Sequence, residues 1–309
     1  MRTILAIVLA MLLCVSSGLA QNRDAQATAD MNAIEAELLK TAASTCDRIE
    51  FPHLVAYFDK GLLAPVAELK FGQRLEKGYT EVARFLHLTY DPRERGSSKK
   101  PDYYVTDRGG LSHAWPTRVI LRAKRVVPDG LSIAYHETTH LLVMHNPSAP
   151  RNRGDLPPDE DARVWANSAF WLPDGFADYV SFEIAKKLHV IPTDLFDEGK
   201  SQAEVDAHAR KWLNDPRGRA VLPFMAAHGI PDNFLADREN VAAPYYVLGH
   251  SFVNFLVRRF GKATIVRLYD KQANGVGAIE DDFRSVTGAD LASVRYDWLK
   301  TLGLDRVSN

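Results

Sequence analysis

The sequence feature that most constrains the fold is the segment His136–His140, which reads His-Glu-Thr-Thr-His. Each residue of an α-helix advances by about 100° and 1.5 Å, so side chains four positions apart lie on one face. The imidazoles of His136 and His140 can then meet a single metal ion, with the carboxylate of Glu137 at the edge of that face. A chain with this motif is expected to place it on a helix and to supply a further ligand from another segment.

The residue types of this motif predict metal-assisted hydrolysis. Zinc lowers the pKa of a bound water to about 7, and a neighbouring carboxylate such as Glu137 can accept the proton of that water. The flanking residues are apolar and predict a largely buried helix; they are Leu131, Ile133, Ala134, Leu141, Leu142, Val143 and Met144. Buried polar groups need partners, and a metal ion would supply one. The alternative is a core helix whose histidines make only structural hydrogen bonds.

A third ligand is needed because a catalytic zinc site normally has three protein ligands and an open fourth position. The extended pattern HExxHxxGxxH is excluded, since Val143 and Asn146 occupy its glycine and histidine positions. Further along, Asp174 and Asp178 lie four residues apart in an apolar segment, so both carboxylates project from one side of a helix. Glu183 is a more distant candidate that would require a different alignment of that helix.

The segment Trp171–Val180 reads WLPDGFADYV. It resembles the second metal-binding helix of gluzincins, the thermolysin- and aminopeptidase-like peptidases in which HExxH is followed by roughly WLxEGxAxYV. The resemblance implies that His136 and His140 bind Zn²⁺, that Asp174 is the third ligand, and that Glu137 is the general base. It also implies a zincin-like fold in which a small sheet precedes the HExxH helix.

The sequence departs from the gluzincin pattern at Asp174, where those peptidases have glutamate. Aspartate is shorter by one methylene, so either the second helix packs closer, the ion shifts, or the site is weaker. Asp178 occupies the register at which, in thermolysin-like gluzincins, an acid accepts a hydrogen bond from a zinc-binding histidine. The alternative for Asp178 is a solvated acid on the helix surface.

A donor for the developing oxyanion is predicted in the helical run that starts at Pro244 and ends at Phe260–Gly261. This run resembles the helix that follows the metal site in gluzincin-like families. On that register Tyr246 is the first choice for the donor, and Tyr245 and His250 follow it. The alternative for each residue is ordinary core packing.

The N-terminus predicts export. Residues 1–20 combine a basic Arg2, an apolar run and small residues before Gln21, which is typical of a cleavable signal peptide. No second long apolar segment follows, so we expect no membrane span after cleavage and a periplasmic or extracellular location. Cys46 is then the only cysteine, which excludes an internal disulfide.

Charge gives no indication of nucleic-acid binding, because the 309-residue chain has a formal net charge of −1. Its densest basic run, Arg122–Arg125, is interpreted as the exposed face of a strand. Hydrophobic spacing predicts an α+β fold, in which a small mixed sheet is followed by a mostly helical catalytic half. Residues 21–130 are expected to form a helical segment and that sheet, and residues 131–309 the helical metal-binding region, within one domain overall.

Individual elements are predicted from local patterns. The N-terminal segment up to residue 90 has mostly helical spacing, and strands are expected at 103–106 and 117–121. Helices are expected at 201–212 and 291–302. The segment 146–163, between the two metal-binding helices, is interpreted as a surface loop.

These features together predict an exported zinc metallopeptidase that hydrolyses peptide bonds in a peptide or protein substrate. Two alternatives remain. One is a peptidase-like binding protein with weak or no catalysis, because of the aspartate at position 174. The other is a metal-dependent amidase that acts on cell-wall peptide. The sequence carries no signal for an oligomeric state.

Overall fold

The computed structural model describes residues 33–88, 100–108, 112–115, 117–127, 129–143, 169, 171–192, 200–223, 225, 238–274 and 277–304. The predicted signal peptide and the predicted loop at 146–163 lie outside these residues. Within the described ranges, no helix combines the length and apolar character needed to cross a membrane.

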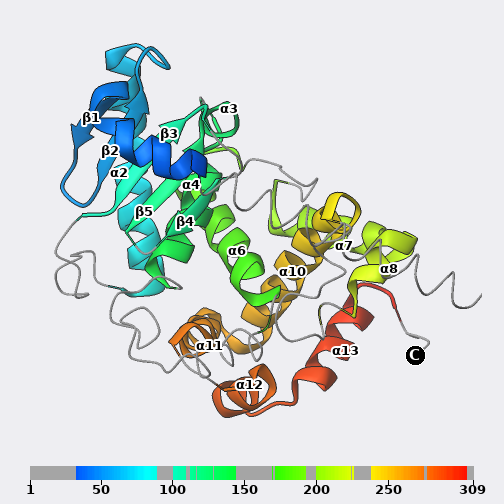
Figure 1. The fold of residues 1–309 in the computed structure, drawn as a ribbon. Helices are drawn as coiled ribbons and strands as arrows, with labels where there is room; N and C mark the ends of the chain where they lie inside the picture. The colour runs from blue at the N-terminus through cyan, green and yellow to red at the C-terminus, as the bar shows by residue number, and fades with distance from the viewer. Residues whose placement is uncertain are drawn as a thin grey trace, which may run out of the picture.

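The fold is α+β, with a five-stranded mixed sheet in the N-terminal part and helices after it (Figure 1). The strands are β1 (Cys46–Glu50), β2 (Val55–Asp59), β3 (Asp102–Thr106), β4 (His113–Trp115) and β5 (Arg118–Arg122). Their order in the sheet is β1-β2-β3-β5-β4. Strands β2, β3 and β5 are parallel, whereas β1 and β4 run antiparallel to their neighbours and form the two edges.

Alternation along the strands gives the sheet two apolar faces. Tyr104 and Ile120 point to one face, where they pack against a helix over residues 33–45. Tyr103, Val105 and Val119 point to the other face and join the main core with α2 (Pro65–Leu86) and α4 (Leu131–Leu142). The HExxH helix is therefore held directly against the sheet.

The strands β3 and β5 confirm the predictions at 103–106 and 117–121 within a residue. The expectation of a mostly helical segment before residue 90 was wrong for β1 and β2, which form a hairpin between the helix over residues 33–45 and α2. Each strand has five residues, and a run this short does not distinguish strand from helix by its apolar spacing. In β1 the spacing is further obscured because the strand lies at an edge and exposes most of its residues.

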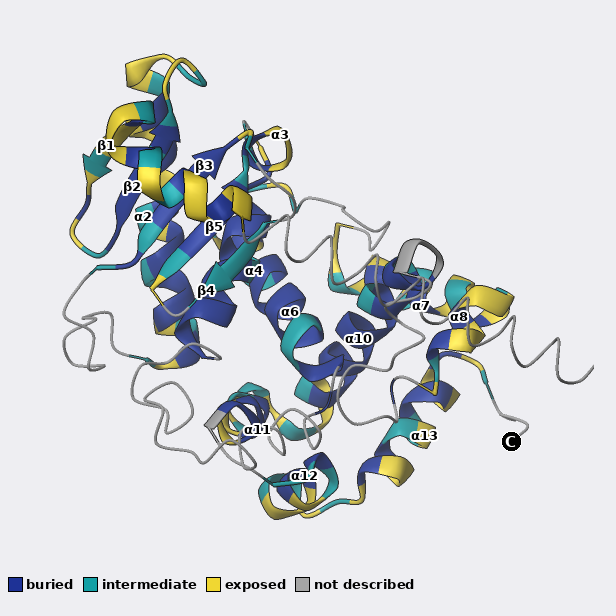
Figure 2. Cartoon of the chain, viewed as in Figure 1, coloured by how far each residue is buried: buried dark blue, intermediate teal, exposed yellow. Residues whose placement is uncertain are grey.

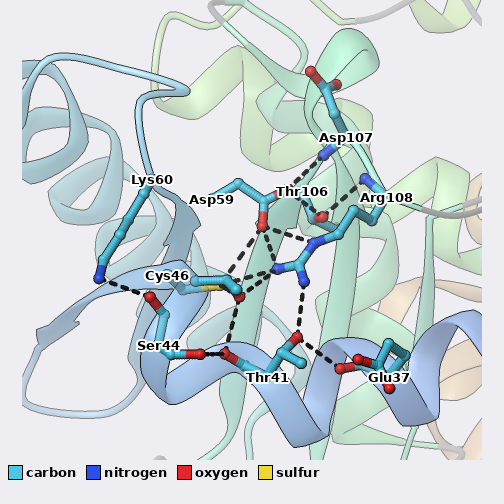
Figure 3. A network of polar contacts seen from close by, with 10 residues as sticks. Glu37, Thr41, Ser44, Cys46, Asp59, Lys60, Thr106, Asp107 and Arg108 are labelled. Carbon is cyan, nitrogen blue, oxygen red and sulfur yellow. Dashed lines mark hydrogen bonds and ion pairs between the residues drawn. The ribbon is translucent and has the colours of Figure 1, made fainter.

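A polar network fixes the helix over residues 33–45 to the sheet (Figure 3). The guanidinium of Arg108 forms an ion pair with Asp59 and donates to Thr41 Oγ1 at 3.0 Å and to Thr45 Oγ1 at 3.1 Å. Asp59 also accepts from the Thr106 hydroxyl at 2.6 Å. One carboxylate thus connects β2, β3 and the helix. The unpaired Cys46 is buried at the same junction.

The other helices in the described part of the chain are α3 (Ala123–Val126), α6 (Trp171–Lys187), α7 (Gln202–Asn214), α8 (Pro216–Val221), α10 (Arg238–Phe260), α11 (Lys262–Asn274), α12 (Ile279–Thr287) and α13 (Leu291–Thr301). Helices α7 and α13 confirm the predictions at 201–212 and 291–302. The basic run Arg122–Arg125 is not a strand face, because β5 ends at Arg122 and the short α3 begins at Ala123. Ala123 and Val126 are buried in this turn while its two basic residues face solvent.

Helices α4, α6 and α10 form the centre of the molecule (Figure 1), and their residues are mostly buried (Figure 2). Helix α6 packs on α4 with one side and on α10 with another. The α6–α10 crossing is very close at Gly175 and Gly249: a Cβ added to Gly175 would lie 2.6 Å from the backbone of Gly249. Because Gly175 directly follows Asp174, this crossing sets the position of the acid that was predicted as third ligand.

Candidate metal centre

The two histidines of the motif face each other on α4. Their Nε2 atoms are 2.9 Å apart, and their ring planes are nearly perpendicular. Almost every residue of α4 is buried, including Glu137 at 7% and His140 at 9% exposure. The predicted helix is thus present, and its spacing brings the two ring nitrogens to one point.

Asp174 completes the group from the first turn of α6. Its Oδ1 lies 3.6 Å from His136 Nε2 and 3.3 Å from His140 Nε2. The aspartate therefore reaches both imidazoles despite being one methylene shorter than glutamate. His136, His140 and Asp174 are the three residues that the sequence proposed as ligands, and the structure brings them together as a group that could hold a metal ion.

The separations between these donors suit a small divalent cation. Three donors that bind a tetrahedral zinc ion at about 2.0–2.1 Å are about 3.3 Å from one another. The three separations in this group, 2.9, 3.3 and 3.6 Å, lie around that value. Two imidazoles and one carboxylate are also a donor set used by catalytic zinc sites.

The hydrogen bond at the outer nitrogen of His136 fixes which of its ring nitrogens carries the proton. His136 Nδ1 lies 2.6 Å from Asp178 Oδ1, and an ionised carboxylate can only accept, so this nitrogen carries a proton. The Nε2 of a neutral His136 then presents a bare lone pair, 2.9 Å from His140 Nε2 and 3.6 Å from a carboxylate oxygen. Nitrogens this close need either a metal ion or a proton between them.

Asp178 therefore occupies the position that the sequence proposed for it. Its carboxylate contacts the outer nitrogen of a metal-binding candidate and is buried, with 7% exposure. The alternative of a solvated surface acid was wrong. A contact of this kind fixes the tautomer and orientation of a metal-binding imidazole.

The pKa values of the group follow from burial and mutual attraction. Burial lowers the pKa of His136, but the charge of Asp178 and the hydrogen bonds with Asp174 and Asp178 outweigh it and hold this pKa well above its usual value. Burial raises the pKa of Asp174, but hydrogen bonds from both histidines hold it below its usual range. In Glu137, burial dominates the attraction of the two imidazoles and raises the pKa. Its carboxylate is thus a stronger base than one in water.

The tyrosines proposed as oxyanion donors lie on α10. Tyr246 is half-buried, and its ring packs edge-on against Tyr245 with 5.3 Å between the centroids. Tyr245 is almost fully buried, and its pKa is raised well above the usual value by burial, with contributions from the charges of Asp174 and Asp178. The hydroxyl of Tyr245 is thus electrostatically coupled to the centre, whereas Tyr246 is the more accessible of the two.

The two remaining candidates have other neighbours. His250 is fully buried and packs edge-on against Phe182 and Tyr179 of α6. Glu183 accepts a hydrogen bond from Gln202 of α7 at 3.4 Å and is not part of the His136, His140 and Asp174 group.

The sequence does not predict the contact between Tyr269 and the centre. Tyr269 Oη of α11 lies 3.2 Å from His140 Nδ1, and both side chains are buried. No local spacing could have revealed this contact, because the two residues are 129 positions apart.

No family model matches the sequence, and no curated protein is significantly similar to it.

Proposed function

We propose that this chain is a zinc-dependent peptidase that is exported and hydrolyses peptide bonds. The observation that carries the proposal is the convergence of His136 Nε2, His140 Nε2 and Asp174 Oδ1 from two helices, with Glu137 adjacent on α4. These three atoms would hold the ion. When bound, zinc polarises the scissile carbonyl and lowers the pKa of a bound water.

The chain's own residues would supply the rest of the chemistry. Glu137 accepts the proton of the attacking water and delivers it to the leaving amine, and its burial favours this role because it strengthens the base. Asp178 keeps His136 in the tautomer that frees Nε2. Tyr246 would donate a hydrogen bond to the developing oxyanion, since a donor to substrate must be accessible.

The sheet offers a means of orienting the substrate. Strand β4 is the edge strand that lies against α4. An extended peptide can add to such an edge through main-chain hydrogen bonds. The gluzincin resemblance implies the same role for the edge strand of the small sheet, which the sequence alone could not identify.

The Glu137→Gln variant tests the proposal. We expect it to retain the zinc content of the wild type and to lose hydrolysis of denatured casein and of a peptide library, because the amide cannot accept the proton. Glu183→Gln is a matched control on α6, since its carboxylate contacts α7 and is outside the centre. Turnover by Glu137→Gln at the wild-type rate would refute its role.

Assays of the wild type separate the alternatives. A zinc-loaded protein that hydrolyses cell-wall peptide but not casein would be the amidase. A zinc-loaded protein that hydrolyses neither would be a peptidase-like binding protein.

A further inference from the structure

The two histidines of the metal centre differ in what holds their outer nitrogens. The partner of His136 is the carboxylate of Asp178, which lies on α6 one turn after Asp174. The partner of His140 is the hydroxyl of Tyr269, which comes from α11. His140 is therefore connected to a part of the chain that contributes no ligand.

A metal-binding imidazole needs an acceptor at its outer nitrogen. For His140 Nε2 to offer a lone pair, the ring proton must be on Nδ1, and the atom facing Nδ1 must accept it. The oxygen of Tyr269 lies 3.2 Å from Nδ1, which places it at the far end of the ring from Asp174. Rotation of an imidazole about its terminal torsion is broadly allowed, so an outer hydrogen bond restricts the ring orientation.

The Tyr269 hydroxyl is held in place by the packing of its own side chain and of α11. The Tyr269 side chain is 1% exposed, and its ring packs against Phe176 of α6 with 5.1 Å between the centroids. One turn further along α11, Gln272 accepts a hydrogen bond from Ala169 N at 3.3 Å and donates to Asp282 at 2.6 Å. Helix α11 is thus fixed to α6 and to Ala169, which lies two residues before α6 begins.

We propose that Tyr269 is a positioning residue, which holds the His140 ring so that Nε2 faces His136 and Asp174. This inference rests on the proposed metal site. It assigns α11 a role in that site, because the hydroxyl that orients the His140 ring on α4 belongs to a side chain of α11. Loss of the hydroxyl leaves the ligand in place but releases its ring.

The first test is the zinc affinity of Tyr269→Phe, measured by competition with a chromophoric chelator. Loss of the hydrogen-bond partner of a metal-binding histidine weakens metal binding by about 10- to 100-fold, and we expect the zinc affinity of Tyr269→Phe to fall by this factor. The matched control is Tyr103→Phe, which removes another buried tyrosine hydroxyl in contact with α4. That hydroxyl lies 2.8 Å from Thr138 Oγ1, and Thr138 is not one of the proposed ligands. We expect Tyr103→Phe to bind zinc as tightly as the wild type, although both variants lose a buried hydrogen bond.

The second test uses metal-free protein, so that it does not depend on zinc binding. In ¹⁵N NMR spectra of histidine-labelled protein, Tyr269→Phe should shift the ring nitrogens of His140 towards those of a free imidazole. Tyr103→Phe should leave them unchanged. If wild-type protein binds no zinc, the proposed function fails, and the His140 shifts still decide the role of Tyr269. Unchanged His140 signals in Tyr269→Phe, or wild-type zinc affinity of that variant, would overturn the inference.

Discussion

The close crossing of α6 and α10 yields a prediction with an internal control. A Cβ at Gly175 would lie 2.6 Å from the carbonyl carbon and oxygen of Gly249, where ordinary contact begins at 3.4 Å, so the helices must separate by about 0.8 Å. A Cβ at Gly249 would meet its nearest atom, Trp171 O, at 3.4 Å, which requires no movement. The same change at two facing glycines should therefore have opposite effects.

The magnitudes follow from overpacking and helix propensity. Overpacking costs about 1–3 kcal/mol, and replacing a helical glycine by alanine gains about 0.5–1 kcal/mol. Gly175→Ala should therefore lower the free energy of unfolding by about 1–2 kcal/mol, whereas Gly249→Ala should leave it unchanged or raise it slightly. The shift also moves the neighbouring Asp174. A metal site tolerates ligand displacements of about 0.2 Å, so we expect zinc binding by Gly175→Ala to weaken at least about tenfold.

Urea unfolding in the presence of a chelator measures the stability of both variants without a contribution from zinc. Chelator competition then measures their zinc affinity. A Gly175→Ala variant that matched the wild type in both measurements, or a Gly249→Ala variant that was equally damaging, would contradict this prediction.

Three further predictions concern single side chains. Asp178→Asn should weaken zinc binding by about 10- to 100-fold in the same competition assay, and an unchanged affinity would argue against its contact with His136 as a determinant of the site. Tyr246→Phe should reduce kcat about 100-fold at constant zinc content, and a loss seen only in Tyr245→Phe would transfer the oxyanion role to that residue. At Asp59, burial raises the pKa, but hydrogen bonds from Arg108 and Thr106 outweigh it and lower the pKa overall, so the ionised form stabilises the fold. This contribution is present at neutral pH and is lost as the pH falls through the lowered pKa. Asp59→Asn should cost about 2 kcal/mol at pH 7, and in urea titrations its difference from wild type should shrink as the pH falls below the ordinary pKa of an aspartate.

The part of the site that sequence could predict is the part encoded by helical periodicity. His136 and His140 are one turn apart, as are Asp174 and Asp178, so each pair shares a helix face whatever the rest of the fold does. That the histidine pair and the aspartate pair lie next to each other was predicted only from the resemblance to gluzincins. Its physical basis is the packing of α6 on α4, which a one-dimensional pattern does not contain.

The contacts that sequence could not predict depend on tertiary packing. Tyr269 approaches His140 because α11 is fixed to α6 through Phe176, and no spacing encodes that approach. The strands differ in the same way in how far the sequence predicts them. Strands β3 and β5 are short apolar runs bounded by turns and were predicted, whereas β1 is a half-exposed edge strand whose residues show no clear alternation.

We propose that one divalent ion is bound by side chains from α4 and α6. It is tested most directly by the metal content of purified protein after zinc loading and dialysis, with wild type measured beside Asp174→Ala. We expect about one zinc per wild-type chain and a large loss in the variant, because two imidazoles alone leave the site incomplete. Wild-type protein without bound metal, or a variant that retains as much zinc as the wild type, would contradict it.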